Sequence, residues 1–362
     1  MFTLGQCAPF AIALGVLAIE LSPAHDLVTG PLLTTTPALA ALTMGPKGTL
    51  SAAALAAAVN VTTATYNQSW GTLTQLIIGN FLGLIVVSVA SVILSNAVRT
   101  RRQSELDQVR RIAVAAQEVV LRPVPEILGP VRAAALCLAA GTGAQIGGDL
   151  YEAIQTRYGV RLIVGDVRGK GLSAIRAVAV ALGAFRESVH YEDEVEEVMN
   201  HCAAALRRES AVPGAYSQEE LPEVLMEGFT TALIAQVPEE QVVQLVNRGH
   251  PPPLVLHDGR VQALMPASPL PPLGLEDLVS GPPARPESYP FLTGDRLLLY
   301  TDGVIEARNR EDEFLPLPEI MERISADTSP QEFLDELHQA LIRHTEDCLT
   351  DDVAMILIDR LA

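Results

Sequence analysis

The chain has 362 residues, of which 49% are hydrophobic and 4% are aromatic. Its formal net charge is −18 at pH 7, and nearly all of its charged residues lie from Arg99 onward. Before that point the only charged side chains are those of Glu20, Asp26 and Lys47. This acidity argues against nucleic acid as a partner, because phosphate binding needs clustered Lys and Arg. The length predicts two or three domains.

Residues 1–96 are expected to form a transmembrane helical segment. The run from 76 to 94 has no charged residue and is long enough to span a bilayer. Basic residues follow it in VRTRRQ (98–103), and such residues mark the cytoplasmic side of a span. Four spans are predicted, with two spans and interfacial segments as the alternative. The other three apolar segments are 3–21, 31–45 and 49–65.

This segment predicts a multi-pass protein of the inner (plasma) membrane, held in the lipid bilayer with its C-terminal part in the cytoplasm. An even number of spans also places the N-terminus in the cytoplasm. No positively charged region precedes the first apolar run, which argues against a cleaved signal peptide.

Residues 97–125 are expected to form a cytoplasmic linker, helical from about 97 to 121 and ending before Pro123. Apolar residues recur in it at alternating spacings of three and four, as in an a/d seam of about two heptads. These residues are Leu106, Val109, Ala113, Ala116 and Val120. Two interpretations remain open. The helix packs on its own domain, or it pairs two subunits in a homodimer and transmits a signal from the membrane.

From about residue 126 to 362 the pattern predicts one mixed domain of the α+β class. Helix-like runs lie at 171–188, 194–208 and 329–345, and loops rich in Pro, Gly and acidic residues at 211–227 and 276–290. Hairpin signals such as HDGR (257–260) favour mostly antiparallel pairing over a parallel sheet. The strand-like runs are 133–139, 160–165, 230–237, 242–247, 253–256, 296–300 and 353–358.

Aspartates stand at strand ends or turns in four motifs of this domain. The motifs are Gly148-Asp149, Gly165-Asp166-Val167, Thr301-Asp302-Gly303 and Asp351-Asp352. Taken singly, each is explained as a turn, since Asp and Gly are favoured turn residues. Taken together, acids carried at the ends of buried strands could converge. Oxygen ligands of this kind suit Mg²⁺ or Mn²⁺.

Other catalytic arrangements find little support. No Ser/His/Asp or Cys/His pattern offers a nucleophile. The four cysteines are scattered without zinc-site spacing, and free or buried thiols are expected.

The C-terminal two thirds resemble the bacterial serine phosphatases of the metal-dependent PP2C type, in the branch of the sporulation phosphatase SpoIIE and the stress phosphatase RsbU. The matching segments occur in family order. They are IGGDLYE (146–152), GDVRGKGLSA (165–174), FTTALIA (229–235), NRGHPPPLVL (247–256), GDRLLLYTDGVIEARN (294–309) and DDVAMILI (351–358). The resemblance implies an α/β/β/α sandwich of two antiparallel sheets with two Mn²⁺ or Mg²⁺ ions at one end. The membrane segment is similar to those that precede such domains in actinomycete proteins.

The resemblance also implies roles for the acids. Asp166 would bridge the two metals, and the Val167 carbonyl would be a ligand of one of them. Asp149 would lie on that same side, directly or through water, and Asp149 and Asp166 would be the catalytic pair. Asp302 and Asp351 would hold the other metal, and Asp352 competes with Asp351 for that place. A hydroxide that bridges the metals would attack the phosphorus in line.

The expected function is that of a membrane-anchored protein serine/threonine phosphatase acting on a phosphorylated STAS-type anti-anti-sigma protein. The alternative is a membrane sensor whose phosphatase-like domain only binds a partner. A nucleotide cyclase is disfavoured, because Leu150 and Tyr151 follow the GGD motif instead of Glu and Phe. No substrate-binding residue is assigned. Arg168 and Lys170 are read as a solvated loop and His250 as structural.

Overall fold

The computed structural model describes residues 4–22, 29–66, 74–138, 147–169, 171–211, 229–275, 285–325 and 327–361. The chain forms two compact units, Met1–Val109 and Arg110–Ala362. The helix α4 (Thr74–Val120) contributes residues to both units, and each unit has its own hydrophobic core. The division between the units thus falls within α4, and the boundary predicted at residue 97 lies in the same helix.

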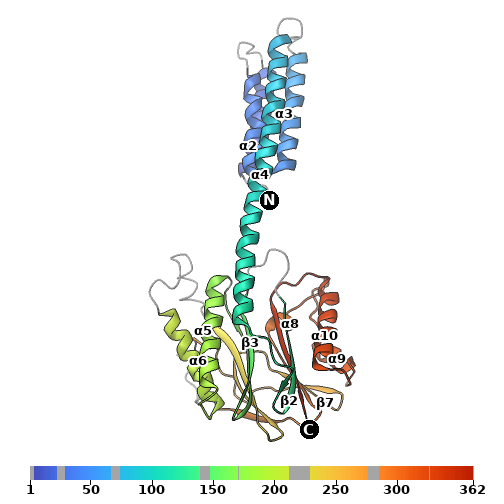
Figure 1. The fold of residues 1–362 in the computed structure, drawn as a ribbon. Helices are drawn as coiled ribbons and strands as arrows, with labels where there is room; N and C mark the ends of the chain where they lie inside the picture. The colour runs from blue at the N-terminus through green and yellow to red at the C-terminus, as the bar shows by residue number, and fades with distance from the viewer. Residues whose placement is uncertain are drawn as a thin grey trace. The chain divides into compact units, whose positions relative to one another are not determined.

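The N-terminal unit is a bundle of helices (Figure 1). Its interior is built from small and medium apolar side chains such as Ala13, Ala56 and Leu84. Large apolar side chains lie on the outside instead, with Val86 66% exposed. This is the reverse of the usual pattern in a water-soluble bundle. Besides α4, the helices are α1 (Leu4–Glu20), η1 (Gly30–Thr34), α2 (Thr35–Thr43) and α3 (Pro46–Tyr66).

The prediction of four membrane spans is not supported. A span needs about 20 residues, and α2 has nine because it ends before the turn at Gly45. Of the described helices, only the segment Ile77–Ser104 of α4 is long and apolar enough to cross a membrane. The apolar part of α1 is the shorter stretch Cys7–Glu20. The helix α3 has 21 residues, but it is rich in alanine and threonine.

The C-terminal unit contains two antiparallel sheets. Sheet A has the strand order β1-β2-β11-β10-β7-β8, and sheet B has the order β3-β4-β5-β6-β9. The strands of sheet A are β1 (Ile127–Leu128), β2 (Val131–Leu138), β7 (Leu254–His257), β8 (Arg260–Ala263), β10 (Arg296–Tyr300) and β11 (Val353–Arg360). Those of sheet B are β3 (Asp149–Thr156), β4 (Gly159–Val167), β5 (Thr230–Val237), β6 (Val242–Arg248) and β9 (Glu287–Pro290).

Helices cover the outer face of each sheet (Figure 1). On sheet B lie α5 (Leu172–Ser188) and α6 (Val195–Ser210), and on sheet A lie α9 (Leu317–Arg323) and α10 (Pro330–Thr345). The helix α10 begins at a capping box of Ser329 and Glu332. Phe333, Leu337 and Leu341 recur on its buried face, as predicted. The predicted α/β/β/α sandwich of the α+β class is confirmed.

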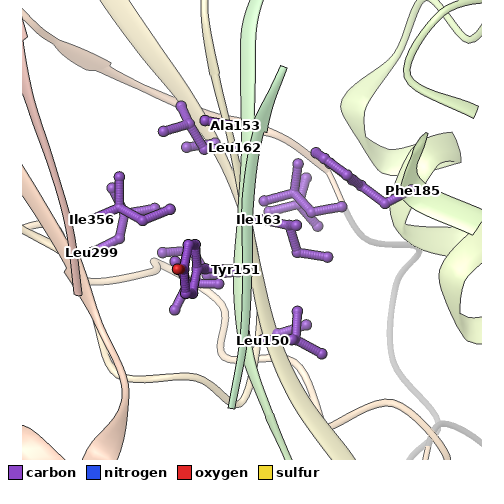
Figure 2. Close-up of a cluster of buried hydrophobic side chains, with 14 of the residues drawn as sticks. Leu150, Tyr151, Ala153, Leu162, Ile163, Phe185, Leu299 and Ile356 are labelled. Carbon is purple, nitrogen blue, oxygen red and sulfur yellow. The ribbon is translucent and has the colours of Figure 1, made fainter. Parts of the chain in front are cut away.

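Strand alternation divides the core into an inner and an outer layer (Figure 2). Tyr151 and Leu162 of sheet B point toward Ile356 of sheet A, in the space between the sheets. Leu150 and Ile163 point the opposite way, toward α5. Neighbouring residues of one strand therefore pack in different layers of the core.

The strand β11 shows the same division in sheet A. Ala354, Ile356 and Ile358 belong to the inner core between the sheets. Val353, Met355 and Leu357 belong to the outer core beneath α10. Because both faces are buried, the strand reads as a continuous apolar run, and this made it easy to predict.

Most predicted elements are present, with two differences. The predicted loop at 276–290 contains a short edge strand, β9, which pairs with β6; residues 276–284 lie outside the described part of the chain, as do 212–228. The linker helix is the continuation of the apolar helix in α4 rather than a separate element, and it ends at Val120. The side chains of Leu106, Val109, Ala113 and Ala116 are not among those described, so the a/d seam stays a prediction.

Candidate active site

Asp149 and Asp166 lie directly opposite each other at the ends of β3 and β4. Both strands form an antiparallel pair, and residues in register project to the same face. Asp149 has the same parity along its strand as Tyr151, whose ring points into the space between the sheets. Both carboxylates therefore stand on the face of sheet B that looks toward sheet A.

Sheet A supplies partners from two strand ends. The hydroxyl of Thr301, just after β10, donates to Asp149 Oδ2 at 2.9 Å. The same Thr301 oxygen accepts from the Ala354 backbone N–H at 2.9 Å, which fixes it against β11. Asp352, just before β11, is buried and accepts from the Gly147 backbone N–H at 2.5 Å. These contacts join the two sheets at the end that carries the acids.

Asp302 and Asp351 form a second group. Asp302 opens the short helix α8 (Asp302–Ile305), and Asp351 is exposed. The pKa of Asp302 is raised above its ordinary value, first by burial and then by the charges of Glu306 and Asp351. Alternation along β11 explains why Asp351 and Asp352 differ: Asp352 shares the parity of the inner residue Ala354, and Asp351 that of the outer residue Val353.

Three glycines permit the close approach of these segments. A Cβ at Gly147 would lie 2.2 Å from the Asp352 carboxylate, and one at Gly303 would lie 1.9 Å from the Asp352 backbone oxygen. A Cβ at Gly148 would lie 2.0 Å from the Val167 backbone oxygen. At Gly148 and Gly303 the clash is with backbone, so these two positions require glycine for space rather than for turn geometry. At Gly147 a Cβ would displace the Asp352 carboxylate.

The carboxyl of Asp149 is buried close to other acidic side chains, and this changes its pKa. Burial raises the pKa of Asp149 well above its ordinary value, and the charge of Asp166 raises it further. The hydrogen bond from Thr301 acts in the opposite direction, and Asp352 and Asp302 add smaller repulsions. Burial, with Asp149 and Asp352 nearby, also raises the pKa of the Cys137 thiol to about 12. Without a bound cation, the Cys137 thiol is therefore neutral and adds no charge beside the acids.

The donors at this site suit hard divalent cations. They are carboxylate oxygens together with the Val167 carbonyl, and oxygen ligands are what Mg²⁺ and Mn²⁺ prefer. A cation would also offset the repulsion between Asp149 and Asp166. Among the described residues, no three His, Cys, Asp or Glu side chains are close enough together to hold one ion. The chemistry of the donor set fits a metal, and the acids fall into an inner and an outer group.

Residues around the acids make well-defined contacts. Arg168 is exposed, and its guanidinium stacks 5.0 Å from the centre of the Phe229 ring. Glu152, buried on β3, accepts a bifurcated hydrogen bond from Arg186 Nε, at 2.9 Å to Oε1 and 2.7 Å to Oε2. His250 is buried, and its Nδ1 lies 3.0 Å from Thr231 Oγ1. Lys170 lies outside the described residues.

Sequence reasoning did not single out Thr301 or Glu306. Thr301 was visible as the first residue of its Thr-Asp-Gly motif, but nothing local shows that it bonds to Asp149, 152 residues away. Glu306 follows Asp302 by four residues, a spacing that places two side chains on one helical face. That spacing was the available signal for Glu306.

Comparison with known proteins identifies the family. Residues 156–361 match the model of the SpoIIE family, described as Stage II sporulation protein E. Phosphoserine phosphatase RsbP of Bacillus subtilis is 28% identical over 220 residues, covering 59% of this chain and 49% of that protein. Protein IcfG of Synechocystis is 25% identical over 239 residues, covering 59% of this chain and 36% of that protein. The chain thus spans about half or less of the length of these relatives.

Solved structures agree on the fold. The RsbU and RsbW domains of a Mycobacterium tuberculosis protein align with a TM-score of 0.55 and 25% identity, over 68% of this chain and 64% of that one. The SiaA PP2C domain of Pseudomonas aeruginosa aligns with a TM-score of 0.56 and 17% identity, over 73% of this chain and 98% of that one. The chain belongs to the SpoIIE family, and its C-terminal unit has the fold of a PP2C-type serine/threonine phosphatase.

Proposed function

We propose that the protein is a membrane-anchored, divalent-metal-dependent phosphatase that hydrolyses phosphoserine or phosphothreonine on a regulatory protein. The observation that carries this proposal is the pairing of Asp149 with Asp166 at one end of a PP2C-type sandwich. Thr301 and Asp352 approach the same end from the other sheet. Carboxylates gathered in this way repel one another, and a bound cation would offset that repulsion.

In this proposal the acids would bind two Mn²⁺ or Mg²⁺ ions, with different acids at each ion. Asp166 would help to hold both ions, Asp149 and the Val167 carbonyl would serve the inner ion, and Asp302 and Asp351 would serve the outer one. When bound, two such ions would lower the pKa of a water molecule and neutralise charge on the phosphoryl group. Thr301 holds the Asp149 carboxylate in its orientation, and Gly148 lets the Val167 carbonyl come close.

The two candidates for the outer ion, Asp351 and Asp352, are expected to respond differently to Asn substitution. Asp351→Asn should weaken Mn²⁺ binding by about 10-fold or more, because it removes a charged ligand near Asp302. Asp352→Asn keeps an oxygen that can accept from Gly147, so Mn²⁺ binding should change by less than about three-fold. Calorimetric titration of both variants with Mn²⁺ measures this. The reverse order of effects would assign the ligand role to Asp352.

The proposed substrate is a phosphorylated STAS-type anti-anti-sigma protein, by family resemblance. One curated relative is named a phosphoserine phosphatase, and one aligned structure contains both RsbU and RsbW domains. Phosphate release from a phosphorylated STAS protein by the detergent-solubilised chain with Mn²⁺ tests the proposal. A folded protein inactive on that substrate and on phosphoserine and phosphothreonine peptides would refute it.

Three features support membrane anchoring of the N-terminal unit. The segment Ile77–Ser104 is long and apolar enough to span. Exposed side chains such as Val86 and Ile93 give the bundle an apolar exterior suited to lipid. Arg101 and Arg102 follow the uncharged run 76–94, which suits a cytoplasmic C-terminal unit. Whether further helices cross the bilayer is decided by topology mapping with cysteine labelling.

The end of α4 is hydrogen-bonded to α5 of the C-terminal unit, and this contact supports a signalling role for the linker. Arg186 of α5 donates to the Val120 backbone oxygen at 2.6 Å and pairs with Glu152. Glu152 lies on β3, three residues after Asp149. A displacement of the end of α4 would therefore act on the strand that carries Asp149. Homodimer formation through residues 97–121 would supply such a displacement.

Insertion of one residue after Ala115 is expected to change regulated activity. One residue turns the following part of a helix by about 100°, so Val120 and its contact with Arg186 would be displaced. Phosphatase activity in vesicles should change by about five-fold or more, while an insertion of seven residues, close to two turns, should have a smaller effect. Equal activity of the one-residue variant and the unmodified chain would exclude transmission through the linker.

A further inference from the structure

A pocket of about 810 Å³ lies within the C-terminal unit, on the side of the sandwich that carries β2 and β3. One wall is the strand β2 of sheet A, and another includes Tyr151 of β3, the edge strand of sheet B. Residues between Gln117 and Glu126, at the end of α4 and in the linker after it, form a third wall. A molecule in this pocket would therefore contact both sheets and the linker at once.

Tyr151 places a polar atom in this pocket. Its side chain points from β3 into the space between the sheets (Figure 2), and the residue is only 9% exposed. No hydrogen bond joins its hydroxyl to any residue that the structure describes. A buried tyrosine hydroxyl usually has a hydrogen-bond partner, and a molecule in the pocket could supply one.

The outer edge of β2 supplies backbone groups to the same pocket. The Ala133 N–H donates to the Glu126 carbonyl at 2.8 Å, on the side of β2 away from β11. Backbone groups that face one edge of a strand recur at every second residue, so those of Ala135 and Cys137 face the same way. No described residue pairs with this edge beyond Ala133. Ala135 and Cys137 both line the pocket, and each has one N–H and one carbonyl on this edge.

The lining indicates the chemistry of a ligand. An N–H and a carbonyl side by side on a strand edge match an amide, which donates and accepts in the same way. Apolar side chains such as Leu121 and Val124 form much of the rest of the lining. Of the described residues that line the pocket, none is basic and one, Glu126, is acidic. The nearby Arg122 side chain is 64% exposed and pairs with Glu152 instead, so an anion would find no counter-charge in the pocket.

We propose that this pocket binds a small, uncharged amide that has an apolar body. The volume of the pocket falls within the range of small-molecule sites, about 300–1,000 Å³, and such sites combine an apolar lining with a few fixed polar groups. The amide would pair with the Ala135 backbone and accept from the Tyr151 hydroxyl, while its body packs against Leu121 and Val124. None of the acids proposed to bind metal lines the pocket, so the test requires neither metal binding nor hydrolysis.

The test is binding of hydrocinnamamide to the full-length chain in lipid nanodiscs, measured by saturation-transfer NMR with the signal of empty nanodiscs subtracted. Hydrocinnamate is the comparison, because it has nearly the same shape but carries a negative charge. The amide should bind at least about 10-fold more tightly than the carboxylate, since burial of an unpaired charge is costly. Equal affinity for the two molecules would overturn the assignment of an uncharged ligand.

Two substitutions locate the binding. Tyr151→Phe removes only the hydroxyl and should weaken amide binding by about 3- to 10-fold, the usual effect of one hydrogen bond. Ala135→Leu fills the pocket from β2 and should remove the saturation-transfer signal. Tyr158→Phe is the matched control, because the Tyr158 hydroxyl donates to the Tyr191 carbonyl and lies outside the pocket. This variant should bind the amide as tightly as the unmodified chain does.

The remaining outcomes decide against the inference. It is overturned if the amide gives no more signal with the protein than with empty nanodiscs. It is also overturned if Tyr151→Phe and Ala135→Leu bind the amide as tightly as the unmodified chain, or if Tyr158→Phe loses as much affinity as Tyr151→Phe. If Ala135→Leu does not fold, the comparison of Tyr151→Phe with Tyr158→Phe decides the question.

Discussion

Asp166→Asn is expected to lower kcat/KM for phosphoprotein hydrolysis by more than about 100-fold, which is the upper figure for outer-shell residues. Asp166 lies opposite Asp149 at the ends of β3 and β4, and in the proposed function it helps to hold both metal ions. The substitution removes one negative charge without changing the size of the side chain. The fold should be retained, and stability should rise, because repulsion between Asp166 and buried Asp149 is relieved. Phosphate release and thermal unfolding measure the two effects.

Asp335→Asn provides the control for charge alone. Asp335 is exposed on α10, and its substitution should leave hydrolysis within about two-fold. The same Asp166→Asn protein also tests the alternative function, a sensor whose domain only binds a partner. If signalling in cells persists in this variant while its hydrolysis is lost, the binding function is favoured. Unchanged hydrolysis would remove Asp166 from the site.

Gly148→Ala is expected to impair both stability and activity. The added Cβ would lie 2.0 Å from the Val167 backbone oxygen, and backbone on both sides would have to move. Overpacking of this kind costs about 1–3 kcal/mol of unfolding free energy. Because the Val167 carbonyl is a proposed metal donor, Mn²⁺ affinity and kcat should each fall by about 10-fold or more. Denaturant unfolding and Mn²⁺ titration measure these changes.

Gly183→Ala is the matched control for that substitution. Gly183 lies inside α5, where an added Cβ meets nothing within 4 Å. Alanine is favoured over glycine in a helix interior by about 0.5–1 kcal/mol, so this variant should be more stable and equally active. A Gly148→Ala protein with full activity would show that the approach to Val167 is not needed for catalysis.

The features predicted from sequence are those with a local signal. The strand β11 could be recognised because both of its faces are buried, and α10 because its apolar residues repeat on one helical face. The aspartate motifs were also visible, since a strand that runs directly into an Asp delivers a carboxylate at a fixed place. The segment 76–94 was recognised from its lack of charge, and it lies within the helix that is long enough to span.

Other features could not be predicted, because neighbouring residues in the sequence carry no signal for them. The four-span prediction relied on apolar composition, and the length of α2 depends on where the chain turns at Gly45. Asp351 and Asp352 are chemically identical neighbours. They differ because Asp352 has the parity of the β11 residues that face the inner core, whereas Asp351 has the parity of those that face the outer core. The edge strand β9 exists because β6 offers it hydrogen bonds, although its sequence is typical of a loop.

The sequence by itself determined the α+β class, most strands and the three longer helices of the C-terminal unit, the apolar segment 76–94 and the aspartate motifs. These depend on side-chain periodicity and on residue chemistry, which are local properties. Only the tertiary structure decided that Thr301 donates a hydrogen bond to Asp149 and that the Gly147 N–H donates one to Asp352. Such contacts join residues up to 205 positions apart. They follow from strand order and register, which arise when two sheets bury their inner faces against each other.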